Sequence, residues 1–294
     1  MVNTVLQAEG LCKQYGKTQA LSDFSVALEP NKIYGLLGRN GAGKTTFLNI
    51  ITSRIFADAG SVAAFGEDAV ENQQILPRIC YMAEKNLFVE KMTVRELLRF
   101  AALFYPRFDR AYAAALCKRF DLNTKNRYRA LSRGYESILR IVIGLASRAE
   151  LTIFDEPTLG LDAAARDQFY QEIIGDFSEH PRTFLLSTHL IEESAGIFEE
   201  VIMVKQGRLM EQTQVDALRQ RACYLTGRAD AVEKAAQGLR TLHAEEIAGL
   251  RICAVYGDIS EEQKIRWRQD GLEVSPVPVQ KLFIYLTDAH KEEN

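Results

Sequence analysis

The segment Gly38–Thr46, GRNGAGKTT, limits the fold of this chain more than any other stretch. The run KIYGLL before it is typical of a buried strand, whereas KTTFLNIITSR after it carries apolar residues at helical spacing. Three glycines between a strand and a helix cost chain entropy and bury little surface, so the sequence predicts a backbone wrapped around a ligand. The spacing Gly38-x-x-x-x-Gly43-Lys44-Thr45 matches the phosphate-binding loop without a gap.

The residue types of this loop predict how it contacts a nucleotide. Glycines let several N–H groups point at the β-phosphate, and the helix that opens near Gly43 adds partial positive charge. Lys44 is expected to reach the β- and γ-phosphates, and Thr45 to offer its hydroxyl to Mg²⁺. A glycine-rich turn without a ligand is the alternative, but it leaves Lys44 and Thr45 unexplained. The expected ATP contacts in the loop are Gly38, Asn40, Gly41, Ala42, Gly43, Lys44, Thr45 and Thr46.

Two adjacent acids follow a second apolar run. Leu151–Phe154 is typical of a buried parallel strand, and Asp155 and Glu156 stand at its end. We expect Asp155 to hold Mg²⁺ through water, and Glu156 to orient and deprotonate the attacking water. An exposed pair of acids without a function is the alternative.

A third strand-like run, TFLLST, leads directly into His189. The carboxyl ends of strands are where open α/β sheets bind their ligands. His189 is therefore predicted to hydrogen-bond the γ-phosphate, although a lone histidine more often has a structural role.

Between these motifs lies ALSRGYESILRIVIGLAS, and the whole set resembles the ATP-binding cassette (ABC) ATPases over residues 4 to 215 or so. The resemblance implies an α/β P-loop NTPase cassette with a helical lobe at about residues 85–140. It also implies that ATP and Mg²⁺ are the cofactors and that Glu156, His189 and Lys44 form the catalytic set.

The family signature LSGGQ reads Leu131-Ser132-Arg133-Gly134-Tyr135 here, so its third and fifth positions depart from the pattern. The resemblance implies that Ser132 and Gly134 cap the γ-phosphate bound by the opposite subunit. A serine here can also cap a helix whose positive end faces that phosphate, or simply begin an ordinary helix.

Three further residues take roles from the resemblance alone. Tyr15 matches the aromatic that stacks on adenine, with a buried core tyrosine as the alternative. Asp162 matches the acid that couples the two sites of a dimer. Glu84 stands where the family usually has Gln, and it is a candidate Mg²⁺ ligand because a carboxylate oxygen can bind the metal directly or through water.

The resemblance also implies partners and a location. Two copies are expected to sandwich two ATP molecules, as a homodimer or as a heterodimer with a paralogous cassette. The exporter group of the family adds a separate integral-membrane permease, which places this subunit in the cytoplasm on the inner face of the cell membrane. No apolar run reaches the roughly 18–20 residues that span a bilayer, and the net charge of −3 argues against a nucleic-acid partner. A soluble ATP-driven switch in an assembly complex is the alternative function.

The motifs end before residue 218, which suggests a cassette domain at residues 1–217 and a separate domain at 218–294. Strand-like and helix-like patterns alternate in the order βαββαβ in this second segment, and a last helix follows. That order suggests a small α+β domain of the ferredoxin-like type.

Overall fold

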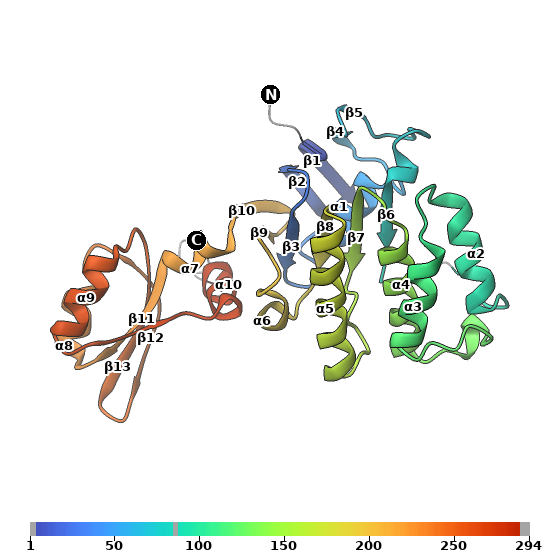
Figure 1. The fold of residues 1–294 in the computed structure, drawn as a ribbon. Helices are drawn as coiled ribbons and strands as arrows, with labels where there is room; N and C mark the ends of the chain where they lie inside the picture. The colour runs from blue at the N-terminus through green and yellow to red at the C-terminus, as the bar shows by residue number, and fades with distance from the viewer. Residues whose placement is uncertain (1–3, 85–87, 289–294) are drawn as a thin grey trace. The chain divides into compact units, whose positions relative to one another are not determined.

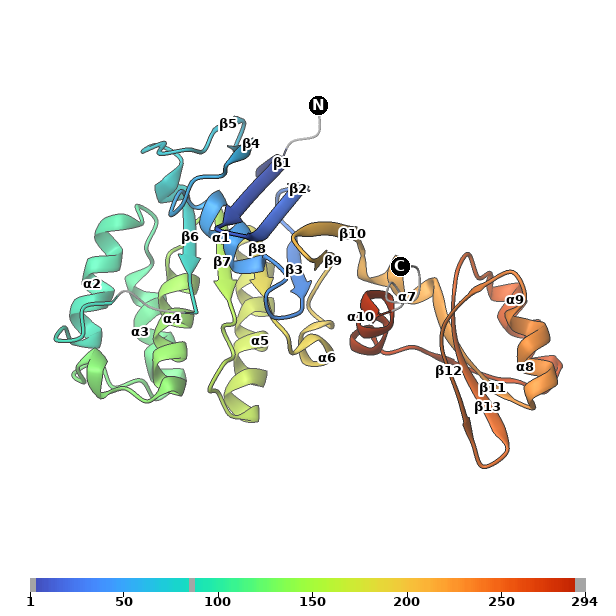
Figure 2. The same ribbon diagram turned by 180° about the vertical axis from the view of Figure 1, so that it is seen from behind.

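The computed structural model describes residues 4–84 and 88–288 (Figures 1 and 2). The described chain forms two compact units. The N-terminal unit comprises the residues up to His189 together with Ile197–Gln212. The C-terminal unit comprises Leu190–Gly196 and the residues from Thr213 onward. A short segment directly after His189 thus belongs to the second unit.

A six-stranded sheet forms the centre of the N-terminal unit, in the order β10-β9-β3-β8-β7-β6. Its strands are β3 (Ile33–Gly38), β6 (Ile79–Met82), β7 (Leu151–Asp155), β8 (Thr183–Ser187), β9 (Glu200–Lys205) and β10 (Arg208–Gln214). The strands from β9 to β6 pair in parallel. Every residue of β3, β7 and β8 is buried, because a parallel sheet is covered on both faces and its strands are therefore apolar along their length.

A second, antiparallel sheet of the N-terminal unit has the order β2-β1-β4-β5. Its strands are β1 (Leu6–Tyr15), β2 (Thr18–Leu28), β4 (Ala59–Ala64) and β5 (Glu67–Asp68). Helix α1 (Lys44–Ile51) shares one apolar core with both sheets. The rings of Phe24 in β2 and Phe47 in α1 lie 4.8 Å apart in this core, which fixes the helix into which the phosphate loop leads.

A helical lobe lies beside the sheets and contains α2 (Val94–Phe104), α3 (Arg110–Arg119) and α4 (Arg133–Ala146) (Figure 1). Two short 3₁₀ turns, Leu76–Arg78 and Tyr128–Ala130, lead into β6 and α4. Thr93 begins α2 with a capping box, and Asp109 begins α3 by accepting a hydrogen bond from the Tyr112 N–H. Helix α4 contacts α2, α3, β6 and β7, so it joins the lobe to the sheet. Helix α5 (Ala163–Glu179) follows β7.

The C-terminal unit contains an antiparallel sheet in the order β12-β13-β11-β14. Its strands are β11 (Ala222–Gly227), β12 (Arg240–Ile247), β13 (Leu250–Tyr256) and β14 (Glu273–Pro276). Helices α8 (Ala229–Ala236) and α9 (Glu261–Gln269) lie on one face of this sheet (Figures 1 and 2). The strand order and the two helices make a βαββαβ sandwich, whose core contains Leu225, Val255 and Trp267.

Helix α10 (Val279–Asp288) uses the other face of that sheet, where side chains alternate with those of the core. The Tyr285 ring stacks on His243 at 4.8 Å between centroids, and its hydroxyl lies 3.2 Å from that of Tyr224. Helix α10 also contacts α6 (Ile191–Ser194), and the Glu192 N–H donates to Gln280 Oε1 at 3.3 Å. The unit is completed by α7 (Val215–Gln220). In the part of the chain that is described, every helix is too short or too polar to cross a membrane.

Candidate active site

Four neighbouring strands bring the predicted site residues to one edge of the six-stranded sheet. Strand β3 ends at Gly38, β7 ends at Asp155, and β8 is followed closely by His189. Strand β6 is followed by Glu84. The carboxyl ends of parallel strands share an edge, and the strand order places these four strands side by side. Residues separated by more than 100 positions in the chain therefore meet at one site.

The phosphate loop needs its glycines for reasons of space. Gly43 is the N-cap of α1 with φ +105°, and a Cβ there would lie 2.5 Å from the Ala20 carbonyl oxygen. A Cβ on Gly38 would lie 2.9 Å from the Val204 carbonyl oxygen. Gly41 also has a positive φ of 79°, a backbone conformation that residues other than glycine rarely adopt. The loop is thus a tightly fixed backbone turn at the start of a helix.

Lys44 lies inside this loop, with only 7% of its surface exposed. Its ammonium donates a hydrogen bond of 2.6 Å to the Gly38 carbonyl and a longer one of 3.4 Å to the Arg39 carbonyl. Burial lowers the pKa of Lys44, while the carboxylates of Glu156 and Asp155 oppose that shift. The loop therefore surrounds a buried cation at the helix N-terminus.

Asp155 is joined directly to the loop. It is 2% exposed, and its Oδ2 accepts a hydrogen bond of 3.1 Å from the Thr45 hydroxyl and one of 3.4 Å from the Tyr81 hydroxyl. Within residues 4–84 and 88–288, no three His, Cys, Asp or Glu side chains gather as a metal site. A hydroxyl beside one carboxylate still fits Mg²⁺, which is commonly held by one or two protein oxygens together with phosphate and water.

Glu156 and His189 form a direct pair that the sequence did not reveal. His189 Nδ1 lies 2.7 Å from Glu156 Oε2. The Glu156 backbone has φ +49°, and its N–H donates to the Ser187 carbonyl at 2.8 Å. Burial raises the pKa of Glu156, and the nearby His189 partly offsets this. The pairing needs β7 beside β8, and that neighbourhood cannot be read from the two motifs alone.

The signature segment begins α4. Ser132 is the N-cap, and its Oγ accepts a hydrogen bond of 3.4 Å from the Tyr135 N–H. Gly134 lies against Gly160, because a Cβ on Gly134 would be 2.8 Å from the Gly160 carbonyl oxygen. Asp162 caps α5 by accepting from the Ala165 N–H at 2.8 Å. Among the described residues, Ser132 hydrogen-bonds within its own helix and with no residue of the phosphate loop.

Two of the remaining candidates have exposed side chains. Tyr15 ends β1 and is 50% exposed, so the alternative of a buried core tyrosine is wrong. The Lys13 ammonium lies 5.8 Å from the centre of the Tyr15 ring. The Glu84 side chain is exposed, while its backbone carbonyl accepts a hydrogen bond of 2.9 Å from Arg140. Sequence reasoning missed Arg140, whose only signal was a charge inside the apolar run ILRIVIGLAS.

Solved structures share the fold of the N-terminal part. A structure titled "Structure of ATP binding subunit of ABC transporter" matches with a TM-score of 0.66 at 24% identity, over 74% of this chain and 92% of that chain. The dimeric ATP-binding cassette MJ0796, bound to ADP and Pi in a post-hydrolysis state, matches with a TM-score of 0.64 at 20% identity. That match covers 71% of this chain and 98% of the other. The observed α/β cassette with its helical lobe is thus an ABC fold.

Sequence comparisons agree with the fold. The family model described as "ABC transporter" matches residues 21–159. The ABC transporter ATP-binding protein YtrB of Bacillus subtilis is 32% identical over 74% of each chain. The bacitracin transport ATP-binding protein BcrA of Bacillus licheniformis is 28% identical over 93% of this chain and 92% of its own length. The daunorubicin resistance ATP-binding protein DrrA3 of Streptomyces coeruleorubidus is 30% identical over 74% of this chain and 71% of its own.

These relatives are ATP-binding proteins of transport and drug resistance, so the alternative of a soluble switch in an assembly complex gains no support. The chain therefore belongs to the ABC transporter family, as an ATP-binding subunit that hydrolyses ATP to power transport through a separate permease.

Proposed function

We propose that this subunit uses Glu156 as its catalytic base and powers the export of a drug or an antimicrobial peptide. The observation that carries the proposal is the Glu156–His189 pair of 2.7 Å, next to the Asp155–Thr45 contact and the Lys44 loop. A buried carboxylate with a raised pKa accepts a proton more readily than an exposed one does. The carboxylate is also held in place by an imidazole.

The roles of the site residues follow from their positions. The N–H groups of residues 38–46 and the Lys44 ammonium bind the phosphates of ATP. Thr45 and Asp155 would hold Mg²⁺, which would neutralise phosphate charge, and Glu84 is a further candidate ligand. Glu156 takes the proton of the attacking water. His189 orients Glu156 through Nδ1, which leaves Nε2 for the γ-phosphate.

Adenine binding and dimer formation involve exposed residues. Half of the Tyr15 surface is exposed, which leaves an aromatic ring for stacking on adenine. The exposed Ser132 and, two residues later, Gly134 stand at the start of α4, whose N-terminus favours an anion. We place them against the γ-phosphate held by the second copy, so that two ATP molecules lie between two subunits. The dimeric form of MJ0796 supports this arrangement, and this chain supplies both halves of each site as a homodimer, although a paralogous cassette could replace one copy.

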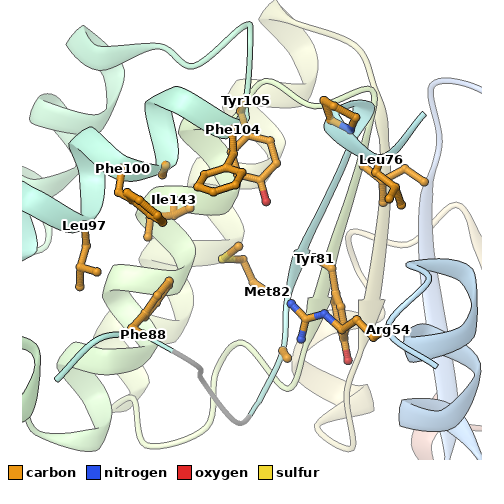
Figure 3. Close-up of a pocket in the computed structure, with 14 residues that line it drawn as sticks. Arg54, Leu76, Tyr81, Met82, Phe88, Leu97, Phe100, Phe104, Tyr105 and Ile143 are labelled. Atoms are coloured by element: carbon orange, nitrogen blue, oxygen red, sulfur yellow. The ribbon is translucent and has the colours of Figure 1, made fainter. Parts of the chain in front are cut away.

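An apolar pocket of about 510 Å³ suits the permease (Figure 3). Figure 3 shows Phe100 and Phe104 of α2 on one side and Tyr81 and Met82 of β6 on another, with Ile143 of α4 beside Phe100. Phe100 and Phe104 remain 50% and 57% exposed. Exposed aromatic residues around a pocket are typical of a docking site. Its proposed occupant is a cytoplasmic segment of the membrane partner, which places this subunit in the cytoplasm on the inner face of the membrane.

The proposed substrate class comes from the relatives. BcrA, named for bacitracin transport, matches almost the entire chain, including the C-terminal unit. DrrA3 is named for daunorubicin resistance. Export of an antimicrobial peptide or a drug is the function that these two names support best.

We expect Phe104→Glu to prevent stable association with the membrane permease, because a carboxylate would have to be desolvated inside the pocket. Leu103→Glu is the matched control. It adds the same charge one position earlier on the same helix, at a residue that is 77% exposed and does not line the pocket. Purification of the tagged chain from detergent-solubilised membranes of its host measures which membrane proteins are retained. A polytopic protein retained by Leu103→Glu and lost by Phe104→Glu supports the proposal, whereas retention by both variants or capture of soluble proteins alone contradicts it.

We also propose that the chain contains two domains divided near residue 213. A chain that ends at Gln212 should fold and keep its ATP affinity within about tenfold, or 1.4 kcal/mol. The glycines of the phosphate loop lie against β2 and β9, and both strands belong to the N-terminal unit. The kcat of this fragment should change more than its ATP affinity. Helix α6 follows His189 closely, and in the fragment it loses its contacts with α10. Gln280→Ala in the full chain removes only the hydrogen bond to Glu192 and should have a smaller effect. Equilibrium ATP binding and thermal unfolding provide the measurement, and an insoluble or non-binding fragment would show that the division is wrong.

A further inference from the structure

A buried arginine in the middle of the signature helix has no role in the site so far. Arg140 lies two turns into α4 and is only 4% exposed. Among the acidic residues that the structure describes, none forms an ion pair with it within 4 Å, whereas the buried Arg182 pairs with Asp176. A buried cation without such a partner is costly unless its N–H groups are satisfied by other acceptors.

The acceptors of Arg140 are two backbone carbonyls of the Glu84 loop and a serine hydroxyl of α4 itself. Its Nη1 donates to the backbone carbonyls of Ala83 and Glu84, both at 2.9 Å. Its Nη2 donates to the Ser137 hydroxyl at 2.6 Å, and that hydroxyl donates to the Leu159 carbonyl at 2.6 Å. Ser137 is fully buried, one helical turn before Arg140. One continuous set of hydrogen bonds therefore joins the Glu84 loop, α4 and the loop that follows Glu156.

The two ends of this set have different surroundings. Ala83 lines the apolar pocket together with Met82, and Ile143 lines it one turn along α4 from Arg140 (Figure 3). Leu159 stands three residues after Glu156, and the Leu159 N–H donates to the Glu156 carbonyl. A displacement of the Ala83–Glu84 backbone is thus passed to Glu156 through Arg140, Ser137 and Leu159, each hydrogen-bonded to the next.

We propose that Arg140 is a positioning residue that links the pocket-lining Glu84 loop to the Leu159 loop and so holds Glu156 in place for hydrolysis. The link rests on the proposed function of Glu156 and of the pocket. Its prediction is specific: removal of the link misplaces the base but leaves the Lys44 loop, and hence ATP binding, intact. A base misplaced by about 1 Å can cost up to about 10²-fold in rate.

The test measures kcat, KM and equilibrium ATP affinity for the full chain, four single variants and the double variant Arg140→Met/Ser137→Ala at equal folded fractions. Arg140→Met keeps an unbranched apolar stem and removes the donors of the guanidinium, and Arg140→Lys keeps the charge. Ser137→Ala removes the hydroxyl that joins Arg140 Nη2 to the Leu159 carbonyl, and it leaves the two bonds from Nη1 in place. Arg182→Met is the matched control for loss of a buried arginine, because Arg182 is also buried. It precedes the amino end of β8, whereas the active site lies at the carboxyl ends of the strands.

The proposal expects Arg140→Met to lower kcat by about 10- to 10²-fold with unchanged ATP affinity. Ser137→Ala should lower kcat less, and the double variant should be no worse than Arg140→Met, because residues of one network are not additive. Arg140→Lys should restore part of the rate. Arg182→Met should lower the Tm without changing kcat.

Three results would overturn the proposal: kcat losses that add in the double variant, equal kcat losses in Arg140→Met and Arg182→Met, or a parallel loss of ATP affinity. A separate variant, Glu156→Gln, tests the proposed function itself. If Glu156→Gln hydrolyses ATP at the normal rate, Glu156 is not the base, whatever the Arg140 series shows.

Discussion

Glu156→Gln is expected to lower the rate of ATP hydrolysis by roughly 10²- to 10⁴-fold while ATP still binds. The amide fills the same space and can keep a hydrogen bond to His189, but it cannot accept the proton of the attacking water. Lys44 and the loop of residues 38–46 are unchanged by this substitution, so affinity for ATP should be retained. Steady-state phosphate release and equilibrium binding of a fluorescent ATP analogue measure the two quantities.

Glu179→Gln is the control for this variant, because Glu179 is an exposed acid at the end of α5. It removes one carboxylate from the same chain and should leave the rate unchanged. Hydrolysis by Glu156→Gln at a rate close to that of the unaltered chain would instead assign the base to His189 or to the substrate itself.

Ser132→Arg should abolish the ATP-dependent dimer, and with it almost all hydrolysis that needs the composite site. The substitution puts a long side chain where the γ-phosphate of the opposite copy is expected, and it removes the cap of α4. Loss of an N-cap alone costs about 1 kcal/mol, which is too little to unfold the helix within this core. Light scattering with ATP, on chains that carry Glu156→Gln with and without Ser132→Arg, measures the molar mass and so distinguishes dimer from monomer.

Ser132→Thr is the control for the cap, since threonine also caps helices. That variant should still form the dimer with ATP. A dimer that persists without nucleotide and survives Ser132→Arg would place the contact elsewhere, and the composite site would then be wrong.

The local parts of the site could be predicted from the sequence. The phosphate loop follows from the spacing of Gly38, Gly43 and Lys44, because glycine, lysine and a following threonine have few other reasons to stand together. The position of the acids at the end of β7 was also predictable, since an apolar run followed by Asp155 and Glu156 is typical of a buried strand and its carboxyl end. These features depend on neighbours in the chain.

The contacts between distant segments could not be predicted. The Glu156–His189 pair depends on β7 lying beside β8, and the links from Arg140 depend on where α4 crosses the ends of β6 and β7. The sequence also gave no sign that Leu190–Gly196 belongs to the C-terminal unit. Strand order and helix packing are set by the whole core, and no short pattern encodes them.

The chemical state of the nucleotide retained by Glu156→Gln tests the central claim most directly. The variant and the unaltered chain are mixed with ATP and Mg²⁺ and separated quickly from free nucleotide, and the bound nucleotide is analysed by chromatography. The assignment of Glu156 as the base predicts intact ATP on the variant and mainly ADP on the unaltered chain. Bound ADP formed on the variant as fast as on the unaltered chain, or no retained nucleotide on either, would contradict it.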